Sequence, residues 1–428
     1  MNRLFFTLIL VFTVCASVLA QTVQAPDTLI LKRTPVIDGI VNDSEWDIFY
    51  ESNEDGNLIS TYANWDNNYF YFCVKTSQLS NVAMEIDCAG DEWPVGNDNY
   101  MFKAFHDKGF EVYRASEDIA SVLFLINPLD QSTVICEQGT VNGEHVVEVA
   151  IPVATVLKGF SLKPGTLFGF NIAVQTANKE NAKWVMFNPA DMSNNCISAK
   201  LVTSKTSILG DMTLDFSLER EIITAGESLD GKIRISNKGT EAVTISDVFL
   251  VGDGACEKYV NAYKILVGNI NSKKTFQREY HTGTSSEIGN GTWVLSAEVY
   301  SGDIKVGAAL KSFEVVPSVI AEPITPKVPV YSDAKEYKVG VKLINYAKNS
   351  SSGDVTIVPP DGWVPKGGRT VLPFKIYGYK KVALVEFKVV PPIGAFGEAN
   401  FKFNVKTSKG IQEIPVSFRI IPAEKAMK

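Results

Sequence analysis

Histidine is scarce in this sequence, with only His106, His145 and His281 among 428 residues. A multi-histidine metal centre and a catalytic triad that depends on histidine are therefore disfavoured. The patterns Gly-x-Ser-x-Gly, His-Glu-x-x-His and the phosphate-binding P-loop are also absent. No segment of the chain carries a recognised catalytic motif, and we expect a protein that is not an enzyme.

Positive charge is also limited. The chain has 41 Lys and Arg against 48 Asp and Glu, for a net charge of -7, and no basic run of five residues. This balance argues against nucleic acid as a partner. After residue 20, no apolar segment reaches the roughly 20 residues of a membrane-spanning helix.

Five cysteines follow residue 20, and none forms a Cys-x-x-Cys pair, which disfavours a zinc ribbon or a redox motif. Export would permit disulfides, and one or two bridges are possible among the four that lie in the first domain. The sequence cannot assign the pairing of the five, which are Cys73, Cys88, Cys136, Cys196 and Cys256.

The first twenty residues have the pattern of a secretory signal peptide. Arg3 precedes an apolar or hydroxyl run over residues 4–14, and Ala20 ends a small-residue stretch suited to cleavage. Cys15 raises the alternative of lipid attachment, but Val14 stands where such sites require a small residue. We predict a protein that is secreted, periplasmic or at the cell surface.

The remaining chain is rich in strand-forming residues, with 24 Phe and 15 Tyr. Short alternating segments, such as the one with Phe70, Phe72 and Val74 on one face, are separated by Asn and Gly clusters. No long segment has the 3.6-residue period of a helix. This pattern of short alternating segments and turns predicts an all-β protein of three β-sandwich domains in tandem.

Five short motifs occur in order through the first domain. They are Ile-Asp-Gly at 37–39 with Glu-Trp at 45–46, Trp-Asp-Asn-Asn-Tyr-Phe-Tyr at 65–71, Glu-Val-Ala-Ile-Pro at 148–152, Gly-Phe-Asn-Ile-Ala-Val at 169–174, and Leu-Gly-Asp-Met-Thr-Leu at 209–214. Together they resemble the signatures of family 9 carbohydrate-binding modules. The resemblance implies a two-sheet β-sandwich over residues 26–214.

The family resemblance also implies a sugar site, since sugar-binding members hold the sugar between two tryptophans with polar groups around it. The residues it assigns here to carbohydrate binding are Trp93, Asp98, Lys183 and Trp184. Met101 stands where the family has Glu, Ala173 where it has Gln, and Lys183 where it has Arg. The scaffold therefore matches the family better than the site does.

Other interpretations of the same residues remain open. Trp46 and Trp65 suit core packing, and Asp98 equally suits hydrogen bonding to loop backbone. No cofactor is predicted, although a structural Ca²⁺ at Asp87, Asp91, Glu92 and Asp98 is an alternative without EF-hand spacing to support it. A haem held by Met101 with His106 or His145 is a further, weaker alternative.

Two immunoglobulin-like sandwiches are predicted over residues 216–316 and 330–422. The run Gly-Lys-Ile-Arg-Ile-Ser-Asn-Lys-Gly at 231–239 resembles adhesion-type modules. Residues 317–329 contain four prolines and are predicted to be a stiff linker. Trp363 is predicted to cap the last sandwich.

These features predict an exported, non-catalytic carbohydrate-binding protein. Three sandwiches use the whole chain and leave no room for the roughly 250-residue barrel of many glycosidases. The expected partners are an oligo- or polysaccharide and, in addition, cell-surface or enzyme proteins. The alternative is a structural or adhesion protein that uses the first sandwich for protein contacts and has lost the sugar site.

Overall fold

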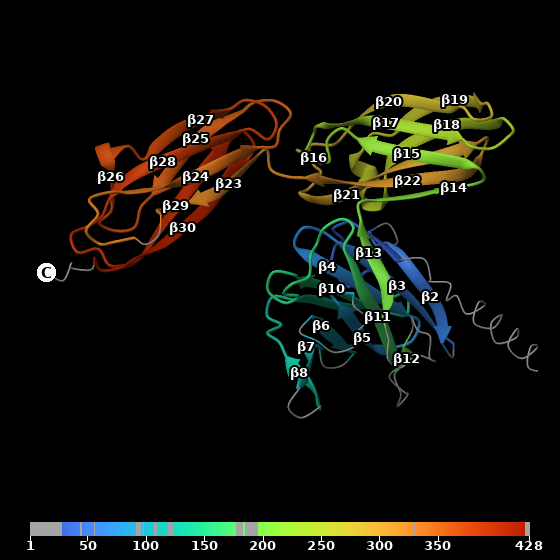
Figure 1. Cartoon of the computed structure of the whole chain (residues 1–428), viewed down its shortest axis with the longest axis horizontal. Helices are drawn as coiled ribbons and strands as arrows, with labels where there is room; N and C mark the ends of the chain where they lie inside the picture. Colours follow the sequence, from blue (N-terminus) through green and yellow to red (C-terminus); the bar gives the residue numbers. More distant parts are fainter. Residues whose placement is uncertain are drawn as a thin grey trace, which may run out of the picture. The chain divides into compact units, whose positions relative to one another are not determined.

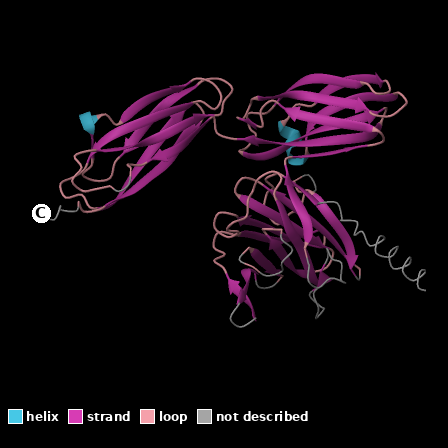
Figure 2. Ribbon diagram, viewed as in Figure 1, coloured by secondary structure: helices cyan, strands magenta, loops and turns pink. Residues whose placement is uncertain are grey.

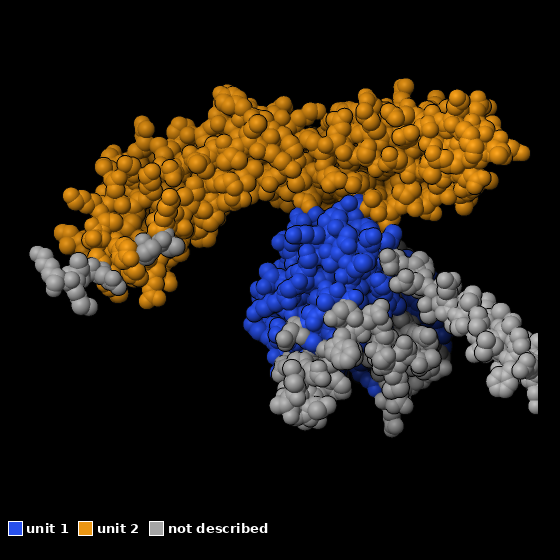
Figure 3. Space-filling model, viewed as in Figure 1, with its two compact units in different colours: residues 1–203 blue, residues 204–428 orange. Residues whose placement is uncertain are grey.

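The computed structural model describes residues 28–42, 45–54, 56–90, 96, 98–106, 109–118, 123–176, 183–184, 196–327 and 330–423. The chain forms two compact units, residues 1–203 and residues 204–428 (Figure 3). Strands dominate both, and the helices within the described ranges are the short 3₁₀ turns η1 (Gly254–Tyr259) and η2 (Lys366–Gly368) (Figure 2). The all-β prediction is confirmed. Among these residues, no helix is long and apolar enough to cross a membrane.

The first unit contains two sheets (Figure 1). The strands of the large sheet are, in spatial order, β1 (Thr28–Leu31), β13 (Ile197–Val202), β11 (Leu167–Thr176), β5 (Ser80–Asp87), β6 (Asn99–Phe105), β7 (Gly109–Asp118) and β8 (Leu123–Pro128), with β12 (Lys183–Trp184) paired to β11. The strands of the small sheet are β2 (Ile48–Glu54), β3 (Asn57–Trp65), β4 (Tyr69–Thr76), β10 (Glu144–Pro152) and β9 (Ile135–Val141).

The two sheets enclose one core because alternate residues of each strand are apolar. Phe70 of β4 packs against Phe168 and Phe170 of β11, with ring centroids 5.5 and 5.7 Å apart. All three rings are buried, and each contributes roughly 1.5–3 kcal/mol relative to exposure. The sandwich architecture predicted for this region is thus observed.

A second apolar layer covers the other face of the small sheet, where Trp46 packs with Tyr62 and Tyr71. Glu148 of β10 is fully buried there and fixes the segment that carries Trp46. Its carboxylate accepts hydrogen bonds from the backbone N–H groups of Asp38 and Gly39, at 2.8 and 2.7 Å, and from Trp46 Nε1 at 3.0 Å. The Ile-Asp-Gly and Glu-x-x-Ile-Pro motifs are therefore two halves of one structural contact.

The Trp-Asp motif is structural as well. Trp65 is 1% exposed, and its Nε1 donates to the carbonyl of Ile30 at 2.9 Å. Asp66 accepts hydrogen bonds from the backbone N–H of Tyr69 at 2.9 Å and from the Tyr71 hydroxyl at 2.6 Å, closing the turn into β4. The core-packing interpretation of Trp46 and Trp65 is confirmed.

The second unit contains two further pairs of sheets, each pair around its own core. The first pair consists of β14 (Ser204–Ile208), β22 (Ile304–Val315), β21 (Gly291–Ser301), β18 (Val243–Gly252), β19 (Tyr263–Ile270) and β16 (Ile222–Ile223), facing β15 (Met212–Leu218), β17 (Ser228–Asn237) and β20 (Thr275–Gly283). The second pair consists of β23 (Val319–Ile324), β24 (Tyr337–Asn345), β28 (Val382–Val390) and β26 (Val364–Pro365), facing β27 (Val371–Ile376), β25 (Ser351–Val358), β29 (Gly397–Thr407) and β30 (Gly410–Ile420).

The domain boundary predicted at residue 214 differs from the structure, which divides the chain between Thr203 and Ser204. Leu214 lies inside β15 and pairs with Ile235 of β17. Leu214 and Phe216 are buried in the core of the second unit's first sandwich. The closing motif at 209–214 therefore starts the next sandwich, because its apolar residues have their partners there.

The predicted linker at 317–329 also differs, since residues 319–324 form strand β23, which pairs with β24. Pro323 lies in this strand, which is at the edge of its sheet. An edge strand tolerates proline because one side of its backbone needs no ladder partner. Trp363 is 8% exposed and packs against Tyr337, Phe401 and Phe418, as its predicted capping role requires.

All five cysteines predicted to be available for disulfides are free thiols. Cys73 and Cys136 lie on neighbouring parts of the small sheet but on opposite faces, one in the Trp46 layer and one against the main core. Burial raises the pKa of the Cys73 thiol well above its usual value, and the Glu148 carboxylate raises it further. Among the described residues, the first domain thus has no disulfide, where the sequence left one or two open.

Candidate functional site

One face of the large sheet points away from the core of the first unit. On β5, Val82, Met84 and Ile86 fill the core, so the residues between them point to the other side. The same alternation holds on β6, β7 and β11. We call this the outer face. Its residues on these four strands are Asn81, Ala83, Glu85, Asp87, Asn99, Met101, Lys103, Phe105, Glu111, Tyr113, Asn171, Ala173 and Gln175.

Glu85 occupies the middle of the outer face. The strand register places it beside Asn171 on one side and Met101 on the other. Burial raises the pKa of Glu85 to about 6, although the nearby Lys103 ammonium partly offsets the shift. Among the described residues, none forms a hydrogen bond with this carboxyl group. A partly buried carboxyl without a partner is costly, and ligand hydroxyl groups would satisfy it.

Polar groups of several kinds surround Glu85. The Lys103 Nζ lies 5.4 Å from the centroid of the Tyr113 ring, and the Tyr113 hydroxyl donates to the Glu111 carboxylate. Four residues along β5 from Glu85, or about 13 Å, Asn81 Nδ2 donates to Gln175 Oε1 at 3.3 Å. Amide, ammonium, phenol and carboxyl groups on one surface are suited to the edge of a sugar, whose hydroxyls both donate and accept.

The Asp98 carboxylate, predicted to bind sugar, accepts a hydrogen bond from the backbone N–H of Ala89 at 3.2 Å. Asp87 holds the same turn, accepting from Ala89 at 3.1 Å and from Gly90 at 2.9 Å. Asp98 thus has the loop-supporting role that the sequence offered as the alternative. Its contact with a sugar stays a prediction.

The other predicted sugar residues are only partly described. Trp93 lies outside the described residues. Lys183 and Trp184 form β12, whose backbone pairs with Val174 and Ala173 of β11. Their contact with a sugar stays a prediction.

The register shows how these segments lie relative to Glu85. Trp184 pairs with Ala173, which is level with Ala83 and Lys103 across the sheet. Asp98 precedes Asn99, and four residues along β6 separate Asn99 from Lys103, or about 13 Å at the usual rise. Glu85 lies between these two levels. The β12 segment and the segment that carries Asp98 therefore lie at different levels of the sheet, on either side of the level of Glu85.

The cofactor alternatives have different outcomes. For the calcium alternative, Asp91 and Glu92 lie outside the described residues. Within the ranges that are described, no group of three or more His, Cys, Asp or Glu side chains is assembled. For the haem alternative, Met101 points away from the core, whereas His145 on β10 follows the core-facing alternation of Val147. Met101 therefore lies on the outer face of the large sheet, whereas His145, on the small sheet, faces the core between the two sheets.

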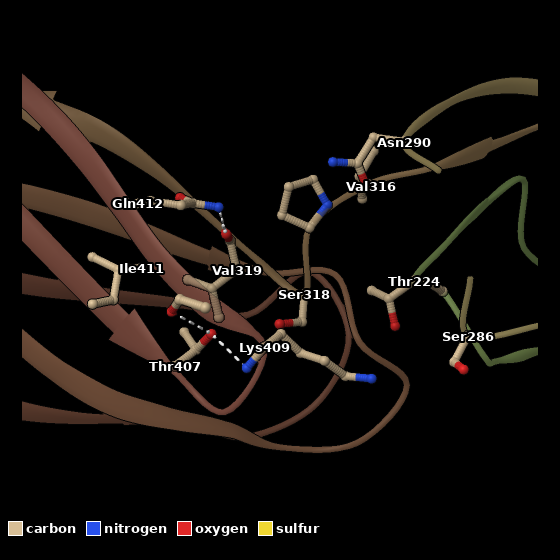
Figure 4. Close-up of a pocket in the computed structure, with 13 residues that line it drawn as sticks. Thr224, Ser286, Asn290, Val316, Ser318, Val319, Thr407, Lys409, Ile411 and Gln412 are labelled. Atoms are coloured by element: carbon tan, nitrogen blue, oxygen red, sulfur yellow. Dashed lines mark hydrogen bonds between the residues drawn. The ribbon is translucent and has the colours of Figure 1, made fainter. Parts of the chain in front are cut away.

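Two hollows elsewhere in the structure are less suited to a sugar than the outer face. One, of about 490 Å³, lies on the small sheet, where Lys75 already pairs with Glu144 at 3.4 Å and Ser60 donates to Glu51 at 3.3 Å. The other, of about 340 Å³, lies in the second unit (Figure 4). Its lining is mostly hydroxyl, amide and aliphatic groups, and no aromatic residue is among them. Neither hollow combines an unsatisfied polar group with an aromatic ring.

Sequence reasoning missed Glu85, although the signal was present. Residues 82–87 alternate between Val82, Met84 and Ile86 at even positions and Ala83, Glu85 and Asp87 at odd positions. A strand covered by core on one side must direct these odd residues to the other side. The family signatures assign the site to tryptophans such as Trp93 and Trp184 instead, and they assign no role to Glu85.

No protein-family model matches the chain, and no curated protein sequence matches it significantly. Among solved structures, a family 9 carbohydrate-binding module from Caldicellulosiruptor kristjanssonii in complex with cellotriose is 18% identical over 41% of this chain and 93% of that one, with a TM-score of 0.30. Red sea bream transglutaminase is 8% identical over 81% of this chain and 57% of that one, with a TM-score of 0.31. Scores this low establish neither a family nor a function.

Proposed function

We propose that the protein binds a glycan through the outer face of its first unit. The observation that carries the proposal is Glu85, a partly buried carboxyl without a hydrogen-bond partner among the described residues, surrounded by polar side chains. Sugar hydroxyls donate hydrogen bonds to such a group. The Tyr113 ring and the Met101 side chain provide apolar surface on the same row of the sheet, as the C–H face of a pyranose requires.

The two units have different roles in this proposal. The first unit recognises the glycan, and the two sandwiches of the second unit present it, without catalysis in either. The segment at the start of the sequence adds the expectation that the protein is exported. The motifs that resemble family 9 modules support the same proposal for β12 and for Trp93 as further sugar contacts.

Titration calorimetry of the full chain against neutral, amino and acidic mono- and oligosaccharides tests this proposal. Replacing Glu85 by Gln removes a charge-assisted hydrogen bond, which costs roughly 1.5–3 kcal/mol, or about 10- to 150-fold in affinity. Trp93→Ala and Trp184→Ala are expected to weaken binding by losing an aromatic surface. Glu51→Gln is the matched control, because Glu51 is a carboxylate on the small sheet.

Two results would contradict glycan binding by the outer face. If no saccharide in the panel binds, or if Glu51→Gln weakens binding as much as Glu85→Gln, the outer face is not the site. A pull-down that identifies a protein partner, together with no saccharide binding, would favour the alternative of a structural or adhesion protein.

A further inference from the structure

The second unit consists of a middle sandwich, β14–β22, and a last sandwich, β23–β30, joined by a short connection. Strand β22 ends at Val315 and β23 begins at Val319, so three residues link the two. Their buried apolar residues form two separate cores, and within the described residues neither core includes members of both sandwiches. Domains without a shared apolar core normally move relative to each other, so other contacts must hold these two together.

Glu227 lies on the turn before β17 in the middle sandwich and uses its two oxygens in different directions. Its Oε2 accepts hydrogen bonds from Arg220 Nη1 at 3.1 Å and from the backbone N–H of Thr224 at 3.2 Å, which fixes the side chain within its own sandwich. Its Oε1 accepts from the backbone N–H of Lys348 at 2.6 Å. Lys348 belongs to the loop between β24 and β25, so this carboxylate connects the two sandwiches.

Asp230, on β17, has a similar arrangement. Its Oδ1 lies 2.5 Å from Nδ1 of His281 on the paired strand β20, and its Oδ2 accepts from Lys348 Nζ at 3.1 Å. The Asp230 side chain is 18% exposed and the Lys348 side chain 57% exposed. Salt weakens such a pair, because charges in 1 M salt are screened beyond roughly 3 Å.

The rest of the contact is loosely packed. The Arg220 guanidinium lies 5.3 Å from the centroid of the Tyr379 ring in the last sandwich, but its buried Nη2 has no hydrogen-bond partner among the described residues. The hollow of about 340 Å³ in Figure 4 is lined by Thr224 and Asn290 of the middle sandwich and by Lys409 of the last. A contact with an unsatisfied donor and open space separates more easily than a packed one.

We propose that the charged contact between the two sandwiches is a salt-sensitive latch, which is closed at low ionic strength and open at high ionic strength. Its residues are Arg220, Glu227, Asp230 and Lys348. When the latch is open, the three-residue connection at 316–318 is the hinge about which the last sandwich moves. The proposal is independent of glycan binding by the first unit.

Zero-length cross-linking of the full chain with a carbodiimide tests the latch, because this reagent joins an ammonium group to a carboxylate that touches it. At low salt we expect Lys348 to be joined to the tryptic peptide that carries Glu227 and Asp230. In about 1 M NaCl the yield should fall about fivefold or more, as for the loss of an exposed ion pair at the top of its usual range.

A second link within the last sandwich is the internal control. Lys342 Nζ lies 2.8 Å from Glu322 on the paired strand β23, and the strand pairing keeps the two side chains adjacent in salt. The yield of the latch link is therefore measured relative to the yield of this control link. A latch link that is absent at low salt, or that keeps its relative yield in about 1 M NaCl, would overturn the proposal without any variant.

Two variants provide a further comparison at low salt. Glu227→Gln removes the charge that holds both Arg220 and the loop of Lys348, so the latch link should fall about fivefold, with an unchanged circular dichroism spectrum. Glu279→Gln is the matched control, because Glu279 pairs with Lys232 at 3.0 Å within the middle sandwich. An equal loss of the latch link in both variants would contradict the assignment of the latch to Glu227.

Discussion

Glu85→Gln is expected to make the first unit more stable at neutral pH while it weakens ligand binding. The pKa of Glu85 is raised from 4.5 to about 6, so the folded protein favours the protonated carboxyl. The stability from this preference is fully present below pH 4.5 and is lost as the pH rises through 6. The shift corresponds to about 2 kcal/mol at pH 7.5.

Glutamine has the shape of the neutral acid and does not titrate, so the variant avoids this loss. We expect it to unfold about 4–8 °C higher than the original chain at pH 7.5 and at the same temperature at pH 4. Differential scanning calorimetry at both pH values, with Glu51→Gln as the control, measures the difference. A variant that is less stable at pH 7.5, or equally shifted at both pH values, would show that Glu85 is already satisfied within the protein.

Three further outcomes follow from the structure. Glu148→Ala leaves three donors, two of them buried, without their acceptor and should destabilise the first unit by roughly 3 kcal/mol or more in thermal unfolding. Gly139→Ala would put a Cβ atom 2.2 Å from the Gly39 carbonyl oxygen, so we expect a comparable loss, and a fully stable variant would contradict the close packing of these strands. Thiol titration of a chain that lacks residues 1–20 should give little reaction at Cys73, which is fully buried, and denaturant should expose all five remaining thiols. Fewer thiols in denaturant would show that disulfides form.

The sequence predicted the all-β architecture because strand alternation is a local property. Phe70, Phe72 and Val74 had to share a face whatever the rest of the chain did, and all three are in the core. The motifs around Trp46 and Glu148 were also recognisable. Their contact, across about 100 residues of chain, was not, since only the folded sheet brings β10 under the segment that carries Trp46.

The boundaries and the site were harder to predict for the same reason. Whether Leu214 closes one sandwich or opens the next depends on its partner, Ile235, and short motifs do not encode the partner. Pro323 suggested a linker because proline breaks central strands, but an edge strand accepts it. Glu85 has no sequence motif at all. Its importance comes from burial and from the absence of a hydrogen-bond partner among the described residues, and both are properties of the folded sheet.

A glycan array probed in parallel with the full chain and with Glu85→Gln tests the central claim most directly. The account predicts that the original chain binds a defined set of related glycans and that Glu85→Gln loses that signal while Glu51→Gln keeps it. An array without any bound glycan, or one on which Glu85→Gln binds as well as the original chain, would contradict glycan recognition by the outer face.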